Sequence, residues 1–511
     1  MRRQKDMKKL FRAIFGRLAV IGLTIVLQVI ILIGFIWFLN TQIWMFEAVN
    51  GILGLIVFFS LIKRDMYPDS KLPWLVIVMA MPLLGTVLYI MFAKNSMSRK
   101  QKKLTLAIQE RANGILASDT GFEIEAPFKG QSEYIKNTTS IPLYKNCACD
   151  YFPSGEQFWT ALKEELERAE KFIFMEYFII ERGVMWNGIL DILTEKVKSG
   201  VEVRVMYDDV GSVAKLPMRY NRKLRKLGIK CVKFNPFRPI VSGIHNNRDH
   251  RKITVIDGKV GFVGGANLAD EYINVTSPFG HWKDSAVRLK GEVVKSLTLM
   301  FLSSYQLQTG VVEDIQGYLP EEYEKVENSG FIQPYLDGPS PAYRHHIGEN
   351  VYINLINSAQ KYLYITTPYL IIDHELQTAL RSAALRGVDV RIITPHIPDK
   401  KIVFNITRSN YKPLMSCGVK IYEYRPGFVH AKNFLADDTV GVVGTINLDY
   451  RSLTHHYECA VWMHNVPALA TLKEDFESTF GECILQTEST IKMNVFKRLI
   501  CTLAQIFTPL L

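Results

Sequence analysis

Cysteine is scarce in this chain of 511 residues, and its distribution excludes two classes of protein. The seven cysteines are odd in number and scattered, and none forms a C-x-x-C pair with a second cluster. A secreted fold held by disulfides needs an even set of cysteines, and a structural zinc site needs paired ligands. We therefore expect free thiols, a reducing compartment and no bound metal.

Net charge is absent from most of the chain. The formal charge of +11 comes from two short stretches, residues 1–17 at +6 and residues 94–111 at +5, whereas residues 112–511 are neutral overall. A body that binds nucleic acid carries a basic surface. The neutral body therefore argues against a nucleic-acid partner.

Three hydrophobic stretches lie between the two basic ones. Residues 18–39 are 22 residues without a charge, enough for a helix to cross a hydrocarbon core about 30 Å thick. The stretch is too long for a signal peptide and lacks a small-residue cleavage site. Residues 44–62 form a second candidate. The third, residues 74–92, is interrupted by Pro82 and Gly85, which predicts that it kinks or turns back.

The two basic stretches predict how the chain meets the membrane. Lys and Arg beside membrane segments favour the cytoplasmic face, and three full crossings would place the two stretches on opposite sides. We expect one hydrophobic segment to be re-entrant or interfacial; the alternative is one basic stretch on the outside. The chain is thus predicted to be a multi-pass protein of a bacterial cell membrane, with its body on the cytoplasmic side.

An internal repeat becomes visible when residues 150–330 are aligned with residues 340–485. The matched pairs are KFIFMEYFII with KYLYITTPYLII, GVEVRVMYDDVG with GVDVRIITPHIPD, and HRKITVIDGKVGFVGGAN with HAKNFLADDTVGVVGTIN. Short apolar strands alternating with stretches of helical length predict a mixed α/β fold with helices on both faces of the sheet. Two copies predict a pseudo-two-fold, bilobal body with one active site between the lobes.

Each repeat carries the same chemical motif. A His is followed by Lys two residues later and by Asp five residues further, and a glycine-led turn then supplies an Asn; the set is His250, Lys252, Asp257, Gly264, Gly265 and Asn267, and His430, Lys432, Asp437, Gly444, Thr445 and Asn447. Residues two apart on a strand point to one face, so each His and Lys can reach one pocket. For the two aspartates we favour a structural anchor over a chemical role.

This set suits displacement at a phosphodiester. One neutral imidazole attacks phosphorus while a protonated imidazole delivers a proton to the leaving oxygen. The lysines and asparagines can hold the other phosphate oxygens, so no metal or cofactor is expected. Each His needs an orienting acceptor on its other ring nitrogen, and the alignment predicts Asp284 for His250 and Glu458 for His430.

The motif resembles the signature of the phospholipase D superfamily, a duplicated H-x-K-x4-D followed by G-G/S-x-N. Within it the chain is most similar to the bacterial cardiolipin synthases, through NRDHRKITVIDG, GGANLADEY, WKD, TPYLIID, GFVHAKNFL and GTINLDYRSLTHHYE. The hydrophobic stretch WLVIVMAMPLLGTVLYIMF is also similar to that family's membrane anchor.

The resemblance implies a two-step phosphatidyl transfer through a phosphohistidine. Phosphatidylglycerol would be the donor, glycerol would leave, and a second phosphatidylglycerol would attack to give cardiolipin. His250 is our choice for the nucleophile and His430 for the acid and base, although the sequence is symmetric on this point. The partners expected are phosphatidylglycerol and anionic membrane lipid, and the oligomeric state is left open.

The chain departs from the family pattern in three places. Thr445 stands where Gly or Ser is commoner, and residues 18–39 are additional to the usual two-segment anchor. The acids lie 34 residues after His250 and 28 after His430, which weakens the assignment of Asp284 more than that of Glu458.

The expected organisation has six parts. They are a basic tail (1–17), a transmembrane segment (18–93), a basic linker (94–149), the first repeat (150–335), the second repeat (336–489) and a C-terminal amphipathic helix (490–511). That helix either lies in the membrane interface or packs on the body.

Other functions remain as alternatives. A hydrolase of the same chemistry, or a transferase using another alcohol acceptor, would carry the same motif, whereas the intact His and Lys pairs argue against a lipid-binding scaffold without activity. The remaining histidines are expected to be ordinary ones, with His455 and His456 as alternatives for the mouth of the pocket.

Overall fold

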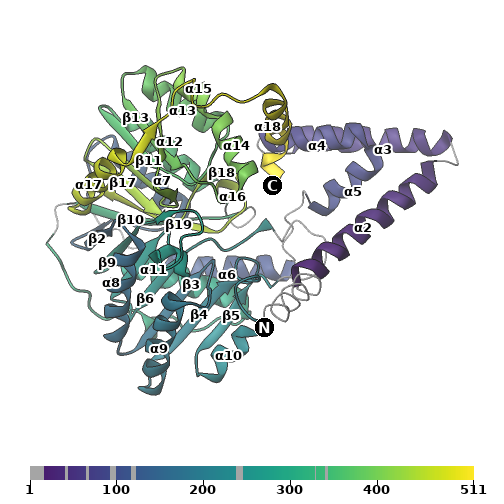
Figure 1. The fold of residues 1–511 in the computed structure, drawn as a ribbon. Coiled ribbons are helices and arrows are strands. Elements are labelled where there is room, and N and C mark those ends of the chain that lie inside the picture. The colour runs from purple at the N-terminus through teal and green to yellow at the C-terminus, as the bar shows by residue number, and fades with distance from the viewer. Residues whose placement is uncertain are drawn as a thin grey trace, which may run out of the picture. The chain divides into compact units, whose positions relative to one another are not determined.

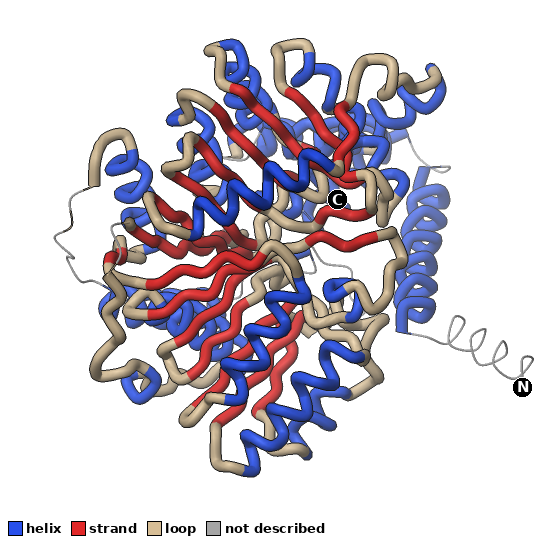
Figure 2. Tube along the Cα trace, turned by 60° about the vertical axis from the view of Figure 1, so that its left-hand side comes forward, coloured by secondary structure: helices blue, strands red, loops and turns tan. Residues whose placement is uncertain are grey.

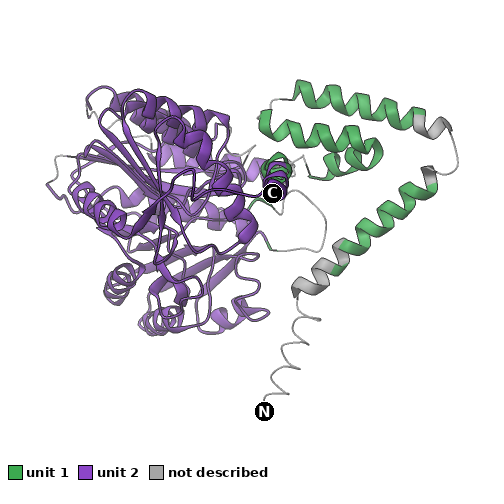
Figure 3. Ribbon diagram, turned by 45° about the horizontal axis from the view of Figure 1, so that its top comes forward, with its two compact units in different colours: residues 1–96, 236–247, 503–511 green, residues 97–235, 248–502 purple. Residues whose placement is uncertain are grey.

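The computed structural model describes residues 17–40, 44–64, 68–92, 99–116, 122, 124–236, 246–327, 330–339, 343 and 345–510. The basic tail predicted over residues 1–17 lies outside this part except for Arg17. Contacts divide the chain into two compact units (Figure 3), unit 1 with residues 1–96, 236–247 and 503–511, and unit 2 with residues 97–235 and 248–502.

The hydrophobic stretches of unit 1 form four helices: α2 (Arg17–Asn40), α3 (Trp44–Lys63), α4 (Pro68–Ala80) and α5 (Pro82–Phe92). The chain turns back between α4 and α5. This turn brings the rings of Trp74 and Tyr89 together edge to face, with centroids 5.6 Å apart. A Cβ atom on Gly85 would lie 2.6 Å from the Cα of Val78, so glycine is required for this close packing. The third hydrophobic stretch is therefore a short hairpin, as its interruption predicts.

The membrane crossings predicted for unit 1 are not shown by the structure. Within the part of the chain that is described, no helix combines the length and the apolar character needed to span a bilayer. The side chains at residues 17–22, 24, 25, 39 and 40 of α2 lie outside that part.

The first lobe of unit 2 contains a seven-stranded mixed sheet in the order β2-β9-β7-β6-β3-β4-β5. Strands β3, β4 and β5 are parallel, and β6, β7 and β9 run antiparallel to their neighbours. The strands are β2 (Ala148–Phe152), β3 (Phe172–Tyr177), β4 (Glu202–Asp208), β5 (Lys230–Phe234), β6 (Ile253–Ile256), β7 (Val260–Gly264) and β9 (Ala286–Lys290).

The second lobe repeats this arrangement in a nine-stranded sheet, β1-β10-β19-β17-β16-β11-β13-β14-β20. Its strands are β1 (Tyr144–Lys145), β10 (Phe331–Asp337), β11 (Tyr362–Thr366), β13 (Asp389–Pro395), β14 (Lys420–Tyr424), β16 (Asn433–Ala436), β17 (Val440–Gly444), β19 (Glu458–His464) and β20 (Cys483–Leu485). Short pairs are formed by β8 (His281–Lys283) with β15 (Gly427–Val429) and by β12 (Leu370–Ile371) with β18 (Leu448–Asp449). The order β9-β7-β6-β3-β4-β5 thus corresponds to β19-β17-β16-β11-β13-β14, which confirms two α/β repeats.

Helices pack on both faces of the two sheets (Figures 1 and 2). They are α6 (Arg99–Leu116), α7 (Phe128–Thr139), α8 (Gly155–Glu167), α9 (Val184–Lys198), α10 (Tyr220–Lys226), α11 (Val294–Thr309), α12 (Ile347–Ser358), α13 (His374–Leu385), α14 (Lys401–Ser409), α15 (Tyr411–Met415), α16 (Tyr450–Thr454) and α17 (Ala468–Gly481). Short 3-10 turns are η2 (Asp270–Ile273) and η3 (Gln316–Tyr318), and the chain ends in α18 (Val495–Phe507) and η4 (Thr508–Leu510).

One hydrophobic core joins the two lobes. Val263 and Val287 of the first sheet and Val443 and Val461 of the second are all buried in the same cluster. Because β7 contacts β17 in this core, the equivalent strand ends of the two repeats are brought together, and these ends carry the motif residues.

Candidate active site

The motif histidines and lysines lie just before the strands and not within them. His250 and Lys252 precede β6, and His430 and Lys432 precede β16. All four are buried. Each lysine folds back on its own histidine, since Lys252 Nζ donates to the carbonyl of His250 at 2.6 Å and Lys432 Nζ donates to that of His430.

Each histidine is paired with the carboxylate of the other repeat. His250 Nδ1 lies 2.9 Å from Glu458 Oε1, and His430 Nδ1 lies 2.6 Å from Asp284 Oδ2. The prediction that each acid orients the histidine of its own repeat is therefore wrong. Both carboxylates are fully buried, so each repeat alone lacks half of its own dyad.

The crossed pairing follows from the backbone just ahead of the motifs. The chain before His250 pairs with the chain before Glu458, because the His250 amide donates to the carbonyl of Tyr457 and the Tyr457 amide to that of Arg248, at 2.9 and 2.8 Å. On the other side β15 pairs with β8, and the His430 amide donates to the carbonyl of Lys283 at 2.7 Å. Each lead-in segment thus pairs with the backbone of the opposite repeat.

Burial sets the charge of the dyads. It lowers the pKa of His250 to about 3 and that of His430 to about 4, with the adjacent lysines adding to the effect. Burial opposes ionisation of Asp284 and Glu458, but the facing imidazoles outweigh it and hold the pKa of each carboxyl below its usual range. A neutral imidazole that donates Nδ1–H to a carboxylate keeps the lone pair on Nε2 for chemistry.

The lysines carry perturbed charges as well. Burial lowers the pKa of Lys252 to about 8 and that of Lys432 to about 7. Each ammonium has donors beyond the one used by its carbonyl partner. The pair can therefore hold an anion near neutral pH.

The two carboxylates are supported differently, and this explains the Gly/Thr difference between the repeats. Thr445 donates its hydroxyl to Glu458 Oε2, and Ser452 donates to Oε1 at 2.7 Å. At the position equivalent to Thr445, a Cβ atom on Gly265 would overlap Asp284 Oδ1. The sequence pattern did not reveal Ser452. The one feature of the sequence that could have pointed to it is its position six residues before Glu458.

The two motif asparagines are not equivalent. Asn267 Oδ1 accepts the amide of Ile179 at 2.9 Å, and its Nδ2 donates to the hydroxyl of Tyr272 at 2.7 Å. Asn267 therefore ties two loops together. Asn447 is also buried, but its Oδ1 has no hydrogen-bond partner among the residues described.

The motif aspartates are backbone anchors. Asp257 accepts the amides of residues 170–172 at 2.7 to 2.8 Å, and Asp437 accepts those of residues 360–362 at 2.7 to 2.9 Å. These amides lie at the starts of β3 and β11. This geometry supports the structural role favoured for both residues.

The environment of the histidines adds two further side chains. The ring of His456 lies 5.4 Å from that of His250, and the ring of Trp282 lies 5.5 Å from that of His430, between centroids. His456 and Trp282 occupy equivalent places two residues before Glu458 and Asp284. His456 was expected to be an ordinary histidine, with a place at the pocket as the alternative. Its contact with His250 agrees with the alternative.

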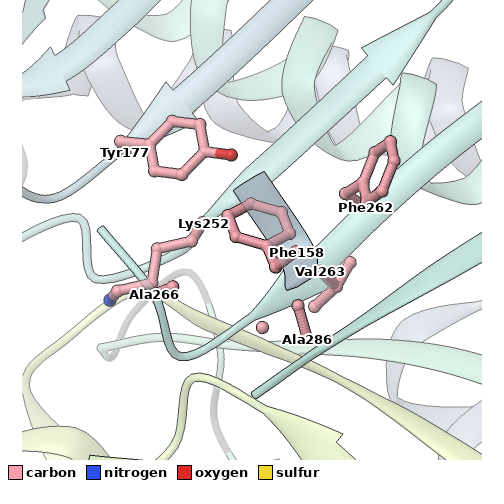
Figure 4. A pocket seen from close by; sticks show the side chains of 8 residues that line it. Phe158, Tyr177, Lys252, Phe262, Val263, Ala266 and Ala286 are labelled. Carbon is pink, nitrogen blue, oxygen red and sulfur yellow. The ribbon is translucent and has the colours of Figure 1, made fainter. Parts of the chain in front are cut away.

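A small apolar space lies beside the stem of Lys252, among the rings of Phe158, Tyr177 and Phe262 (Figure 4). It has no room for a water-sized molecule. Lipid therefore cannot enter it, and its aromatic lining explains the desolvation of the lysine.

Two groups among the described residues have the donors to hold a metal ion. One is His250, His456 and Glu458, and the other is Glu349, Asp373 and Glu375. The dyads themselves need no ion for proton transfer or nucleophilic attack.

The duplicated α/β fold and the two crossed His–carboxylate dyads define a phospholipase D-like enzyme. The family model "Cardiolipin synthase, PLD-like domain" matches residues 162–277 and 352–480, and the model "Phospholipase_D-nuclease N-terminal" matches residues 52–94. The chain belongs to the cardiolipin synthase family of phospholipase D-like proteins and is a phosphatidyltransferase.

Individual relatives agree with this membership. The chain is 33% identical to the cardiolipin synthase of Alkalihalophilus pseudofirmus, with 93% of this chain and 95% of that one covered, and 33% identical to that of Geobacillus sp. WCH70, with 93% and 96% covered. It is 45% identical to an uncharacterized protein of Streptococcus mutans over 88% of this chain and 98% of that one.

The phosphatidylserine synthase of Haemophilus influenzae shares the fold. Its solved structure matches with a TM-score of 0.56 at 16% identity, covering 75% of this chain and 100% of that one.

Proposed function

We propose that the protein is a cardiolipin synthase that converts two phosphatidylglycerol molecules into cardiolipin and glycerol. The observation that carries the proposal is the pair of buried, neutral imidazoles, each backed by an ionised carboxylate of the opposite repeat and flanked by a lysine. The relatives named cardiolipin synthase align with this chain over nearly their whole length, at 33% identity.

The first step forms a phosphohistidine. Nε2 of His250 attacks phosphorus, the bond from phosphorus to the glycerol oxygen breaks, and His430 gives that oxygen a proton. Binding of the phosphodiester anion favours the protonated form of His430 that this step needs. Glu458 orients His250 and stabilises the charge it gains.

The second step reverses the roles of proton donor and acceptor. His430 takes the proton from a hydroxyl of the second phosphatidylglycerol, the hydroxyl oxygen attacks phosphorus, and the bond to His250 breaks. Lys252 and Lys432 hold the non-bridging oxygens in both steps, and Asn447 lies free to bind the headgroup. No metal takes part in this sequence.

The same proposal places the protein at a bacterial cell membrane as a multi-pass protein with its body on the cytoplasmic side. Helix α3 exposes apolar side chains, with Ile52, Leu55, Ile56 and Phe59 each 58 or 59% exposed. The basic stretches beside the helices would be attracted to anionic lipid. The N-terminal family model over residues 52–94 supports the membrane association in this proposal.

The test uses purified protein in detergent with phosphatidylglycerol as the sole substrate and a chelator present. We expect cardiolipin and glycerol in equal amounts. The variants H250Q and H430Q should lose at least about 1,000-fold in turnover, because each dyad is required, whereas H345Q, at an exposed histidine, should match the parent.

Three outcomes would contradict the proposal. Phosphatidic acid as the main product would indicate a hydrolase. A phosphatidyl ester of another added alcohol, formed in place of cardiolipin, would indicate another acceptor. Full turnover in either dyad variant would remove the two-histidine mechanism.

A further inference from the structure

His456 is a buried imidazole that the proposed reaction does not use. Its exposed fraction is 8%, and among the described residues neither of its ring nitrogens has a hydrogen-bond partner. A buried polar group without a partner costs free energy unless a ligand satisfies it. His456 therefore calls for a ligand.

The neighbours of His456 are metal-binding groups. Glu458 Oε1 lies 3.7 Å from His456 Nδ1 and 2.9 Å from His250 Nδ1, and one ligand atom from each of the three residues lies within 4.8 Å of the others. Ligands of a tetrahedral zinc ion with bonds of 2.0 to 2.1 Å are about 3.3 Å apart. The two measured spacings lie on either side of that value, so small side-chain shifts suffice.

The two dyads differ at the place that His456 occupies. The equivalent place beside His430 is occupied by Trp282, whose indole cannot be a metal ligand, so the opposite dyad offers no such site.

We propose that His250, His456 and Glu458 form a binding site for a divalent transition metal ion such as zinc. Two imidazoles and one carboxylate match the ligand preference of Zn²⁺ and leave one coordination position open. Binding at His250 Nδ1 displaces the proton shared with Glu458, and this proton moves to Nε2 of the same ring. On the proposed function, the ion inhibits the enzyme, because Nε2 then carries a proton in place of the lone pair that attacks phosphorus.

The test measures binding before activity. Full-length, metal-free protein in detergent is titrated with Co²⁺, whose visible spectrum reports coordination, and then with Zn²⁺ in competition. We expect one tight site with nitrogen and oxygen ligands and no sulfur-to-cobalt charge-transfer band. H456N should weaken binding at least about tenfold, and H455N, at a neighbouring histidine outside the cluster, should bind like the parent.

Inhibition is then measured relative to the metal-free rate of each variant. The concentration of Zn²⁺ that halves turnover should rise about tenfold or more in H456N and stay unchanged in H455N. Equal binding by H456N and the parent, a sulfur charge-transfer band, or no bound ion would overturn the site. A protein that binds the ion through His456 but makes no cardiolipin would instead contradict the proposed function and leave the metal site intact.

Discussion

At the scale of single residues, the active site is governed by burial. The two motif histidines and two motif lysines are each at most 8% exposed, so the histidines are neutral and the lysines lose their protons unusually easily. Lys252 and Lys432 retain enough charge at neutral pH to attract phosphate. Their low pKa values make that attraction sensitive to alkaline pH.

A pH profile tests this point. In the substrate-free enzyme, Lys252 and Lys432 have pKa values of about 8 and about 7, below the usual 10.5. Their charge is therefore lost as pH rises through this range. We expect kcat/KM to fall about tenfold or more between pH 7 and pH 9. The fall in kcat should come at higher pH, because bound phosphate favours the charged lysines. A kcat/KM that stays constant to pH 10 would contradict the assignment.

At the scale of elements, the motif of each repeat does two separate tasks. The His and Lys form the site, while the Asp five residues later fixes the turn before a central strand. Asp257 has φ of 55°, in the left-handed region, and so has Asp437. Asp and Asn adopt this conformation more readily than most other residues.

Replacement of Asp257 separates stability from chemistry. D257A leaves three backbone amides without their acceptor and places alanine at positive φ, so we expect the free energy of unfolding to fall by about 2–4 kcal/mol. D257N keeps an oxygen and tolerates the conformation, and should lose about 1 kcal/mol. Denaturant unfolding in detergent measures the free energy of unfolding of both variants. Turnover per folded molecule should stay close to that of the parent. Loss of turnover at unchanged stability would instead indicate a chemical role.

At the scale of the whole catalytic body, the two repeats exchange their orienting acids. Neither repeat can assemble a dyad from its own residues, because Glu458 faces His250 and Asp284 faces His430. The two segments that carry the histidines pair with the opposite repeat, so the site forms only when the lobes are associated.

A double-mutant cycle on stability detects this exchange. H250A and E458Q should be coupled by about 1–3 kcal/mol in the free energy of unfolding, whereas H250A and D284N should be additive within about 0.5 kcal/mol. The same cycle with H430A should couple to D284N and not to E458Q. Coupling of H250A to D284N and of H430A to E458Q would instead support the pairing within each repeat that the alignment predicted.

Much of the architecture was accessible from the sequence because it is local. Strand alternation, glycine-led turns and the duplicated His-x-Lys motif are short-range patterns, and they predicted two α/β repeats. The break at Pro82 and Gly85 likewise predicted the hairpin of α4 and α5. The six proposed segment boundaries and the chemical roles of the motif residues stay predictions.

The sequence by itself determined the His, Lys and Asn residues of the site, since a repeated motif can be recognised along the chain without knowing where its residues lie in space. Only the tertiary structure decided which carboxylate meets which histidine, because alignment orders residues along a repeat and strand pairing between lobes is a long-range event. It also decided that His456 lies beside His250 while Trp282 lies beside His430. Two repeats that look equivalent along the chain therefore build unequal halves of one site.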